Sequence, residues 1–375
     1  MLGFLNPEES LLAGFENHQN DFIADLPDKL NEDTRWLAAS ALQKCIRLGL
    51  TQEALHAAHV LKTFSDTHLW YRLSVICLED IGVANVDLAA QVLWMSGKTQ
   101  WRNSHRGDNF ILSYLIPRLC ASRKCRTLDD ALYVAEYHPV YKDQRLIYSG
   151  MAVDELWELF HDERLDVVGR ILISRYLCGT RYRSEVLELQ KRNPSIIFDL
   201  AHSMGAPPYV TDLLSLSRGQ EYFTCLLPAM MQLEQSSFCD AVSDASDPVL
   251  MFGEWPNAAY DRHTRMGKQA FRQFLKKCPD ISGFLQKRVP EADHVNLIGW
   301  AVFILEGQLL NNRIVYDGSE CLRELAAQAW LYSGGMGIEM QDEFLNLVSI
   351  HFKGINDSRG FIRDSMAAFA HGCKG

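Results

Sequence analysis

The chain has 375 residues, of which 47% are hydrophobic and 22% are charged. This composition is average for a globular protein, it excludes wholesale disorder, and the length allows one large domain or two ordinary ones. The formal net charge of −10 is opposite to that of proteins that wrap duplex DNA chiefly by neutralising phosphates. Any nucleic-acid binding would therefore need a local basic face.

Cysteine usage indicates a reducing compartment. None of the ten cysteines stands in a Cys-x-x-Cys spacing, and most lie in apolar helical stretches, as free thiols do. We find no signal-peptide pattern and no apolar run of the roughly 20 residues that span a bilayer, so we expect a cytoplasmic protein without membrane contact. Cys120 and Cys125 would supply only half of a zinc site, and we expect neither a metal nor another cofactor.

Helical periodicity recurs from one end of the chain to the other. Apolar residues share one helix face in each of four segments, which in chain order are 38–46, 165–176, 295–305 and 322–332. Sustained alternation of apolar and polar residues is hard to find. The sequence therefore predicts an all-α fold of antiparallel helices in one or two lobes, and it requires no sheet.

Several helix ends are also readable. Asn85 is a candidate N-cap for the helix that follows it, and residues 127–130 form a near capping box before another apolar helical run. Gly49 and Gly179 follow apolar stretches, as C-terminal caps do. These signals predict many helices with short connections.

The weakest stretch for helix is 240–257, which is rich in Ser, Asp, Gly and Pro. We interpret it as a long loop or a boundary. A second break follows Gly179. The domain prediction is an N-terminal helical lobe over residues 1–178 and a C-terminal helical lobe over residues 179–375.

The segment 72–84 carries the clearest family signal. It reads Arg-Leu-Ser-Val-Ile-Cys-Leu-Glu-Asp-Ile-Gly-Val-Ala, and a weaker signal follows in residues 131–139. Together they resemble the C-terminal helical, clamp-loader-like region of replication-associated recombination ATPases, over roughly residues 53–139. The matching residues in the sharper segment are Arg72, Leu73, Glu79, Asp80, Ile81, Gly82 and Ala84.

The resemblance implies a clamp-loader-collar-like N-terminal part that supports oligomerisation and work at stalled or broken replication DNA. In the family an ATPase domain precedes this region, whereas only about fifty residues come before the match here, so we expect the ATPase domain to be absent.

The same segment has a physical interpretation that needs no family. Glu79 and Asp80 come at the predicted C-terminus of a helix, where the helix dipole disfavours negative charge. We expect them to cap the next helix or to pair with an arginine of a neighbouring helix, with Gly82 supplying a sharp turn. A structural corner is therefore favoured over a catalytic role.

Three motifs suggest chemistry but are incomplete. Residues 96–99, Ser-Gly-Lys-Thr, lack the earlier glycine and the preceding strand of a phosphate-binding loop. His161 and Asp162 are adjacent, like the metal ligands of helical phosphohydrolases, which need two further ligands. His56 and His59 share a helix face but lack the glutamate of the metalloprotease pattern.

Two basic groups are candidate contacts for an anion or a nucleic acid. The first follows one helical segment and the loop after it, and folding could gather its members into a stripe. Its residues are Arg102, Arg106, Arg118, Arg123, Lys124 and Arg126. The second, Arg262, Arg265 and Lys268, lies beside a predicted helix N-terminus that Asp261 or Thr264 could cap.

These observations favour a non-enzymatic scaffold or adaptor in DNA replication, recombination or repair. Its expected partners are DNA, a replication protein or a second copy of itself. A second hypothesis is a helical protein–protein interaction module of a phage or mobile element, without DNA binding. A third is a metal-dependent phosphohydrolase built around His161 and Asp162.

Overall fold

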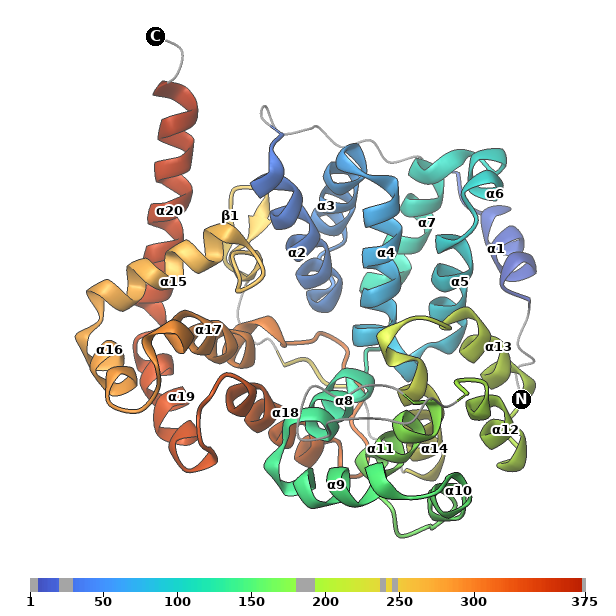
Figure 1. Cartoon of the computed structure of the whole chain (residues 1–375). Helices are drawn as coiled ribbons and strands as arrows, with labels where there is room; N and C mark the ends of the chain where they lie inside the picture. The colour runs from blue at the N-terminus through green and yellow to red at the C-terminus, as the bar shows by residue number, and fades with distance from the viewer. Residues whose placement is uncertain (1–5, 20–29, 180–192, 237–240, 245–248, 373–375) are drawn as a thin grey trace.

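The computed structural model describes residues 6–19, 30–179, 193–236, 241–244 and 249–372. Within these ranges the chain is all-α, as predicted, apart from one two-stranded sheet (Figure 1). No helix of the described ranges is both long enough and apolar enough to cross a membrane.

The helices follow one another with short connections. The first group is α1 (Pro7–Phe15), α2 (Glu32–Leu48), α3 (Thr51–Phe64), α4 (Asp66–Ile76), α5 (Val86–Ser96), α6 (Thr99–Ser104) and α7 (Gly107–Ala121). The second is α8 (Thr127–Tyr137), α9 (Lys142–Gly150), α10 (Val153–Phe160), α11 (Val167–Cys178), α12 (Ile196–Ser203), α13 (Pro208–Leu216) and α14 (Leu226–Gln235). The third is α15 (Arg265–Lys277), α16 (Pro279–Gln286), α17 (Glu291–Val302), α18 (Ser319–Ser333), α19 (Gln341–Ile350) and α20 (Phe352–Gly372).

Shorter helical turns join them. Two are π-helices, η1 (Cys77–Ile81) at the end of α4 and η6 (Phe303–Gly307) at the end of α17. The 3₁₀ turns are η2 (Gly82–Ala84), η3 (Pro139–Tyr141), η4 (Glu221–Cys225), η5 (Asn257–Ala259) and η7 (Ile338–Met340).

The structure bears out several predicted helix ends. The Asn85 side chain accepts a hydrogen bond from the backbone N–H of Leu88 and caps α5. Gly49 ends α2 with φ 76°, a left-handed conformation that costs glycine little. The capping box at 127–130 is wrong, because α8 already begins at Thr127. Its hydroxyl instead pairs with the hydroxyl of Tyr316 at 2.6 Å, a tertiary contact that replaces the local cap.

The stretch predicted as a long loop contains the sheet. β1 (Met251–Phe252) pairs antiparallel with β2 (Trp255–Pro256), and Gly253 turns the chain between them with φ 64°. Val242 also exchanges two backbone hydrogen bonds with Arg313. Two-residue strands are too short for alternation to reveal. Residues 240 and 245–248 of the stretch lie outside the described residues.

Buried apolar side chains form one cluster that runs from Leu11 to Ile355. α8, from the first predicted lobe, packs along α18 of the second, and α2 contacts η5 and β2. η1, which follows the lower end of α4 in Figure 1, contacts α8, and α17 contacts α18. The predicted boundary at residues 178 and 179 therefore separates elements that share a core.

Candidate functional site

A buried ion network occupies the place where α2, η1 and α8 meet. Helix α4 widens into η1, and a π turn shifts the direction of its side chains relative to a regular helix. There Glu79 and Asp80 meet Arg47 of α2. The Arg47 guanidinium donates to Asp80 Oδ1 at 2.8 Å and to Glu79 Oε1 at 2.7 Å. The acids predicted to need a partner at a helix end thus have one, 32 and 33 residues away in sequence.

A second arginine joins the network from the start of α8. Arg126 donates to Asp80 Oδ1 at 2.6 Å and to Glu79 Oε1 at 3.1 Å, and it also bonds Asp129. Its Nε lies 3.7 Å from Asp130. Two arginines therefore face four carboxylates inside the protein.

Because the network has two arginines for four acidic side chains, the pKa values of these acids shift in different directions. Burial would raise the pKa of Glu79, but Arg47 and Arg126 outweigh it and hold the value well below the usual range. Burial raises the pKa of Asp129 to about 8, because the attraction of Arg126 is shared with other acids. Burial likewise raises the pKa of Asp130 to about 6. Burial thus raises the pKa values of Asp129 and Asp130, whereas the two arginines lower that of Glu79.

Gly82 allows the corner to close. Its φ is 51° and its ψ −132°, and a Cβ placed there would lie 2.6 Å from the carbonyl oxygen of Cys125. The Cys125 backbone N–H donates in turn to the carbonyl of Asp80 at 2.9 Å. The absence of a side chain at Gly82 thus lets the segment between α7 and α8 pack directly against the turn that follows η1.

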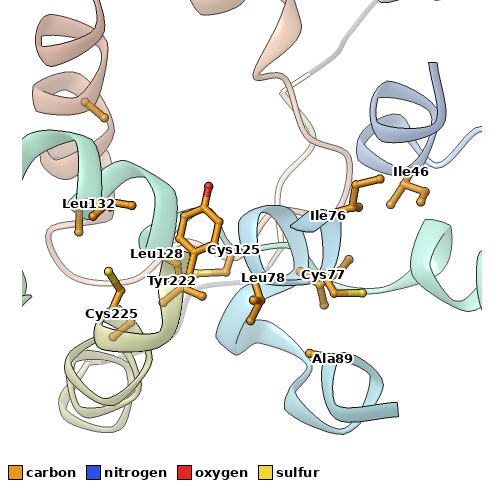
Figure 2. Packing of buried hydrophobic residues seen from close by; sticks show 14 of the residues in the cluster. Ile46, Ile76, Cys77, Leu78, Ala89, Cys125, Leu128, Leu132, Tyr222 and Cys225 are labelled. Carbon is orange, nitrogen blue, oxygen red and sulfur yellow. The ribbon is translucent and has the colours of Figure 1, made fainter. Parts of the chain in front are cut away.

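The corner rests on apolar side chains from several elements. Figure 2 shows Leu78 between Leu128 and Tyr222 on one side and Cys77 and Ile76 on the other. Tyr222 also contributes a polar group, since its hydroxyl donates to Asp129 Oδ1 at 2.8 Å. The network therefore lies on a closely packed core.

A cavity of about 120 Å³ adjoins the network. Charged and polar side chains form one part of its wall, and aromatic side chains form another. The lining residues are Gln43, Lys44, Arg47, Arg72, Glu79, Asp129, Tyr133, Glu221, Tyr222, His263, Trp300, Phe303 and Trp330. Glu221 and His263 are exposed while most of the other lining residues are buried, so the cavity opens to solvent beside these two.

The second π-helix borders the same cavity. Phe303 of η6 lines it, and Arg47 Nη1 donates to the carbonyl oxygen of Gly307 at 2.6 Å. One arginine thus bridges η1 and η6. Leu305-Glu306-Gly307 at the end of η6 is a shorter version of the Leu-Glu-Asp-Ile-Gly run of η1, a signal that the sequence analysis missed. π-Helices occur often at functional sites.

Lys44 forms a separate buried pair at the edge of the cavity. It bonds Asp261, whose carboxylate also accepts from the Ser40 hydroxyl at 2.8 Å. Burial would raise the pKa of Asp261, but Lys44 holds it below its usual range. Arg262, predicted to contact an anion, instead lies 3.3 Å over the ring of Trp300 and donates to Asn296.

The structure corrects the first predicted basic stripe. Arg102, Lys124 and Arg126 are buried and have internal partners, so they are not surface contacts. Arg102 donates to Asp108 at 2.7 Å, and Lys124 donates to the carbonyls of Cys120 and Ser122. The exposed members are Arg106, before α7, and Arg118 and Arg123, at and beyond its other end.

The second basic group extends along α15. Thr264 caps this helix by accepting from the Gly267 N–H at 3.0 Å. Arg265 and Lys268 are exposed, and so are Arg272 and Lys276, which the sequence analysis missed. Spacings of three, four and four residues put all four on one helix face. We call these four residues the α15 basic stripe.

Within the described residues, the three incomplete motifs form no assembled site. α5 ends at Ser96, so a helix precedes Gly97 where a phosphate-binding loop would need a strand. His161 bonds the Trp157 carbonyl and the Ser203 hydroxyl, and Asp162 pairs with Arg164. Among the described residues no three His, Cys, Asp or Glu side chains are grouped to hold a metal ion.

Comparison with protein-family models, with curated proteins and with solved structures finds no match for this chain.

Proposed function

We propose that this chain is a non-enzymatic helical scaffold or adaptor in DNA replication, recombination or repair, and that it contacts DNA through the α15 basic stripe. The stripe is the observation that carries the proposal. Four exposed cations on one helix face form a local positive surface on a protein of net charge −10. Such a surface follows a phosphate backbone without reading its sequence.

Two further features support a scaffold role. The residues that resemble the clamp-loader-like region, above all Glu79, Asp80 and Gly82, act in packing and ion pairing, as a rigid helical corner requires. The stripe has little internal compensation, since within the described part of the chain its ion pair is Arg265 with Asp33 at 3.6 Å. Its charge is therefore available to a partner.

The test is DNA binding at low salt by a charge-reversal variant. We expect the wild-type chain to bind single- or double-stranded DNA and Arg272→Glu/Lys276→Glu to lose most of that affinity. The matched control is Lys142→Glu/Lys353→Glu, which makes the same charge change at exposed lysines off the stripe. Equal loss in both variants, or no wild-type binding at low salt, would overturn the DNA part of the proposal.

Protein–protein docking is a second candidate function. Four large apolar side chains of the segment 140–153 are exposed: Val140, Leu146, Ile147 and Val153. Exposed apolar side chains gathered in one segment are typical of docking surfaces. For a second copy of the chain as the partner, light scattering should show an oligomer that Leu146→Ser/Ile147→Ser weakens. Ile350→Ser, at an exposed isoleucine of α19, is the control. A monomeric wild-type chain would exclude self-association.

A further inference from the structure

Two residues that line the cavity beside the ion network have buried hydrogen-bond donors without partners among the described residues. Trp330 is fully buried and lines the cavity, and its indole Nε1 has no hydrogen-bond partner among the described residues. The Nε of Arg72, another lining residue, also has none. Buried donors are rarely left unpaired, because losing water without a replacement costs free energy. Both groups therefore call for an acceptor.

The charges of the lining residues point the same way. Arg47 has Glu79, Asp80 and the Gly307 carbonyl as acceptors, and Lys44 has Asp261. Arg72 instead donates to an amide oxygen, that of Gln43. Glu79 lies close enough for Arg72 to lower its pKa, but Arg47 and Arg126 contribute more to that shift. Arg72 is thus the lining guanidinium whose charge is least matched.

The acidic lining residues Glu79 and Asp129 already have cationic partners, Arg47 and Arg126. Burial also raises the pKa of Asp129, which favours its uncharged form. The rings of Tyr133, Trp300, Phe303 and Trp330 form a further part of the wall. The positive edges of aromatic rings tolerate an anion, and their faces can hold an attached apolar group.

We propose that this cavity binds a small oxyanion, a phosphate or carboxylate group, through the Arg72 guanidinium and the Trp330 indole N–H. A volume of about 120 Å³ suits a group of this size. The planar edge of a guanidinium can donate to two oxygens of such a group, and the indole N–H can donate a further hydrogen bond to one of its oxygens. This inference is independent of DNA binding, because no residue of the α15 basic stripe lines the cavity.

The test is a titration of the full-length chain with orthophosphate, sulfate and acetate, matched in ionic strength with chloride. Tryptophan fluorescence and the midpoint of thermal unfolding are the readouts, since Trp300 and Trp330 line the site. We expect a saturable change with at least one of the three anions. Phosphate and sulfate acting without acetate would assign a phosphate group, and the reverse would assign a carboxylate. No saturable response to any of them would overturn the proposal.

Variants then separate this site from other anion contacts. Trp330→Phe keeps the ring and removes the N–H, so we expect about a tenfold loss of affinity or more, the effect of one hydrogen bond to a charged group. Trp157→Phe is the matched control and should bind as wild type, because Trp157 does not line the cavity. Arg72→Lys keeps the charge but removes the planar edge and should also weaken binding. The stripe variant Arg272→Glu/Lys276→Glu should respond as wild type. Equal affinity of Trp330→Phe and wild type, or loss in the stripe variant alone, would overturn the assignment.

Discussion

Arg47 and Asp80 form an ion pair of 2.8 Å between side chains that are 1% and 0% exposed. Burying two charges costs several kcal/mol per ion unless good geometry and further hydrogen bonds offset the lost hydration. Here Gln43 and Arg126 supply additional bonds to the same carboxylate. The pair therefore joins α2 to η1 through a network in which each member depends on the others.

Removal of one partner should be far more damaging than removal of both. We expect Arg47→Met to lower the free energy of unfolding by about 3–5 kcal/mol, because Glu79 and Asp80 then lose a buried cation. Arg47→Met/Asp80→Leu should recover part of that loss. Urea unfolding of the two single variants and the double variant measures the coupling. Strictly additive effects would show that the two side chains act independently.

Gly82 should not tolerate a side chain. Gly82→Ala places a methyl group 2.6 Å from the Cys125 carbonyl at a positive φ, so we expect a loss of about 1–3 kcal/mol or more. Gly283 lies inside α16 with open space around its Cβ position. Gly283→Ala should therefore stabilise the protein by up to about 1 kcal/mol. Chemical denaturation compares the two, and equal effects would contradict the packing described at Gly82.

Asp129 should make stability depend on pH. The unfolded carboxyl releases its proton near the ordinary pKa of 3.8, whereas the folded group keeps it to about pH 8. Between these values the folded state binds more protons, so stability falls as pH rises through the window and levels off above it. Asp129→Asn cannot ionise. Its stability relative to wild type should therefore increase from pH 5 to pH 8, as measured by urea unfolding.

The control for this pH effect is Asp154→Asn, which removes the same charge from an exposed position on α10. Its stability difference from wild type should change little over the same range. A pH-independent difference for Asp129→Asn would show that the Asp129 carboxyl titrates as in the unfolded chain.

DNA binding through the α15 basic stripe should depend steeply on salt. Four phosphate contacts predict a slope of log K against log salt of about −3.6 for duplex DNA. Arg272→Glu/Lys276→Glu should reduce the magnitude of that slope by about 1.8, because two contacts are lost. Fluorescence anisotropy over a range of salt concentrations measures both values. A slope that is unchanged in the variant would place the contacts elsewhere.

The sequence alone determined the helical fold and much of its local detail. Apolar spacing predicted the helices, and Asn85 and Gly49 marked ends where the structure has them. The need of Glu79 and Asp80 for a positive partner also follows from local physics, because acids at a helix C-terminus face the negative end of its dipole. These inferences succeed because they depend on residues within about one helical turn.

Tertiary structure decided which side chains meet and which are buried. Arg126 and Arg123 are alike in sequence, yet Arg126 enters the core because acidic side chains of η1 and α8 surround its guanidinium, while Arg123 stays exposed. The residues that line the cavity likewise come from distant parts of the chain, from Gln43 to Trp330. The donors on Arg72 and Trp330 lose their water, and so become unpaired, only when the chain folds. Periodicity shows which face of a helix is apolar, but the free energy of a buried charge depends on partners that are distant in the chain.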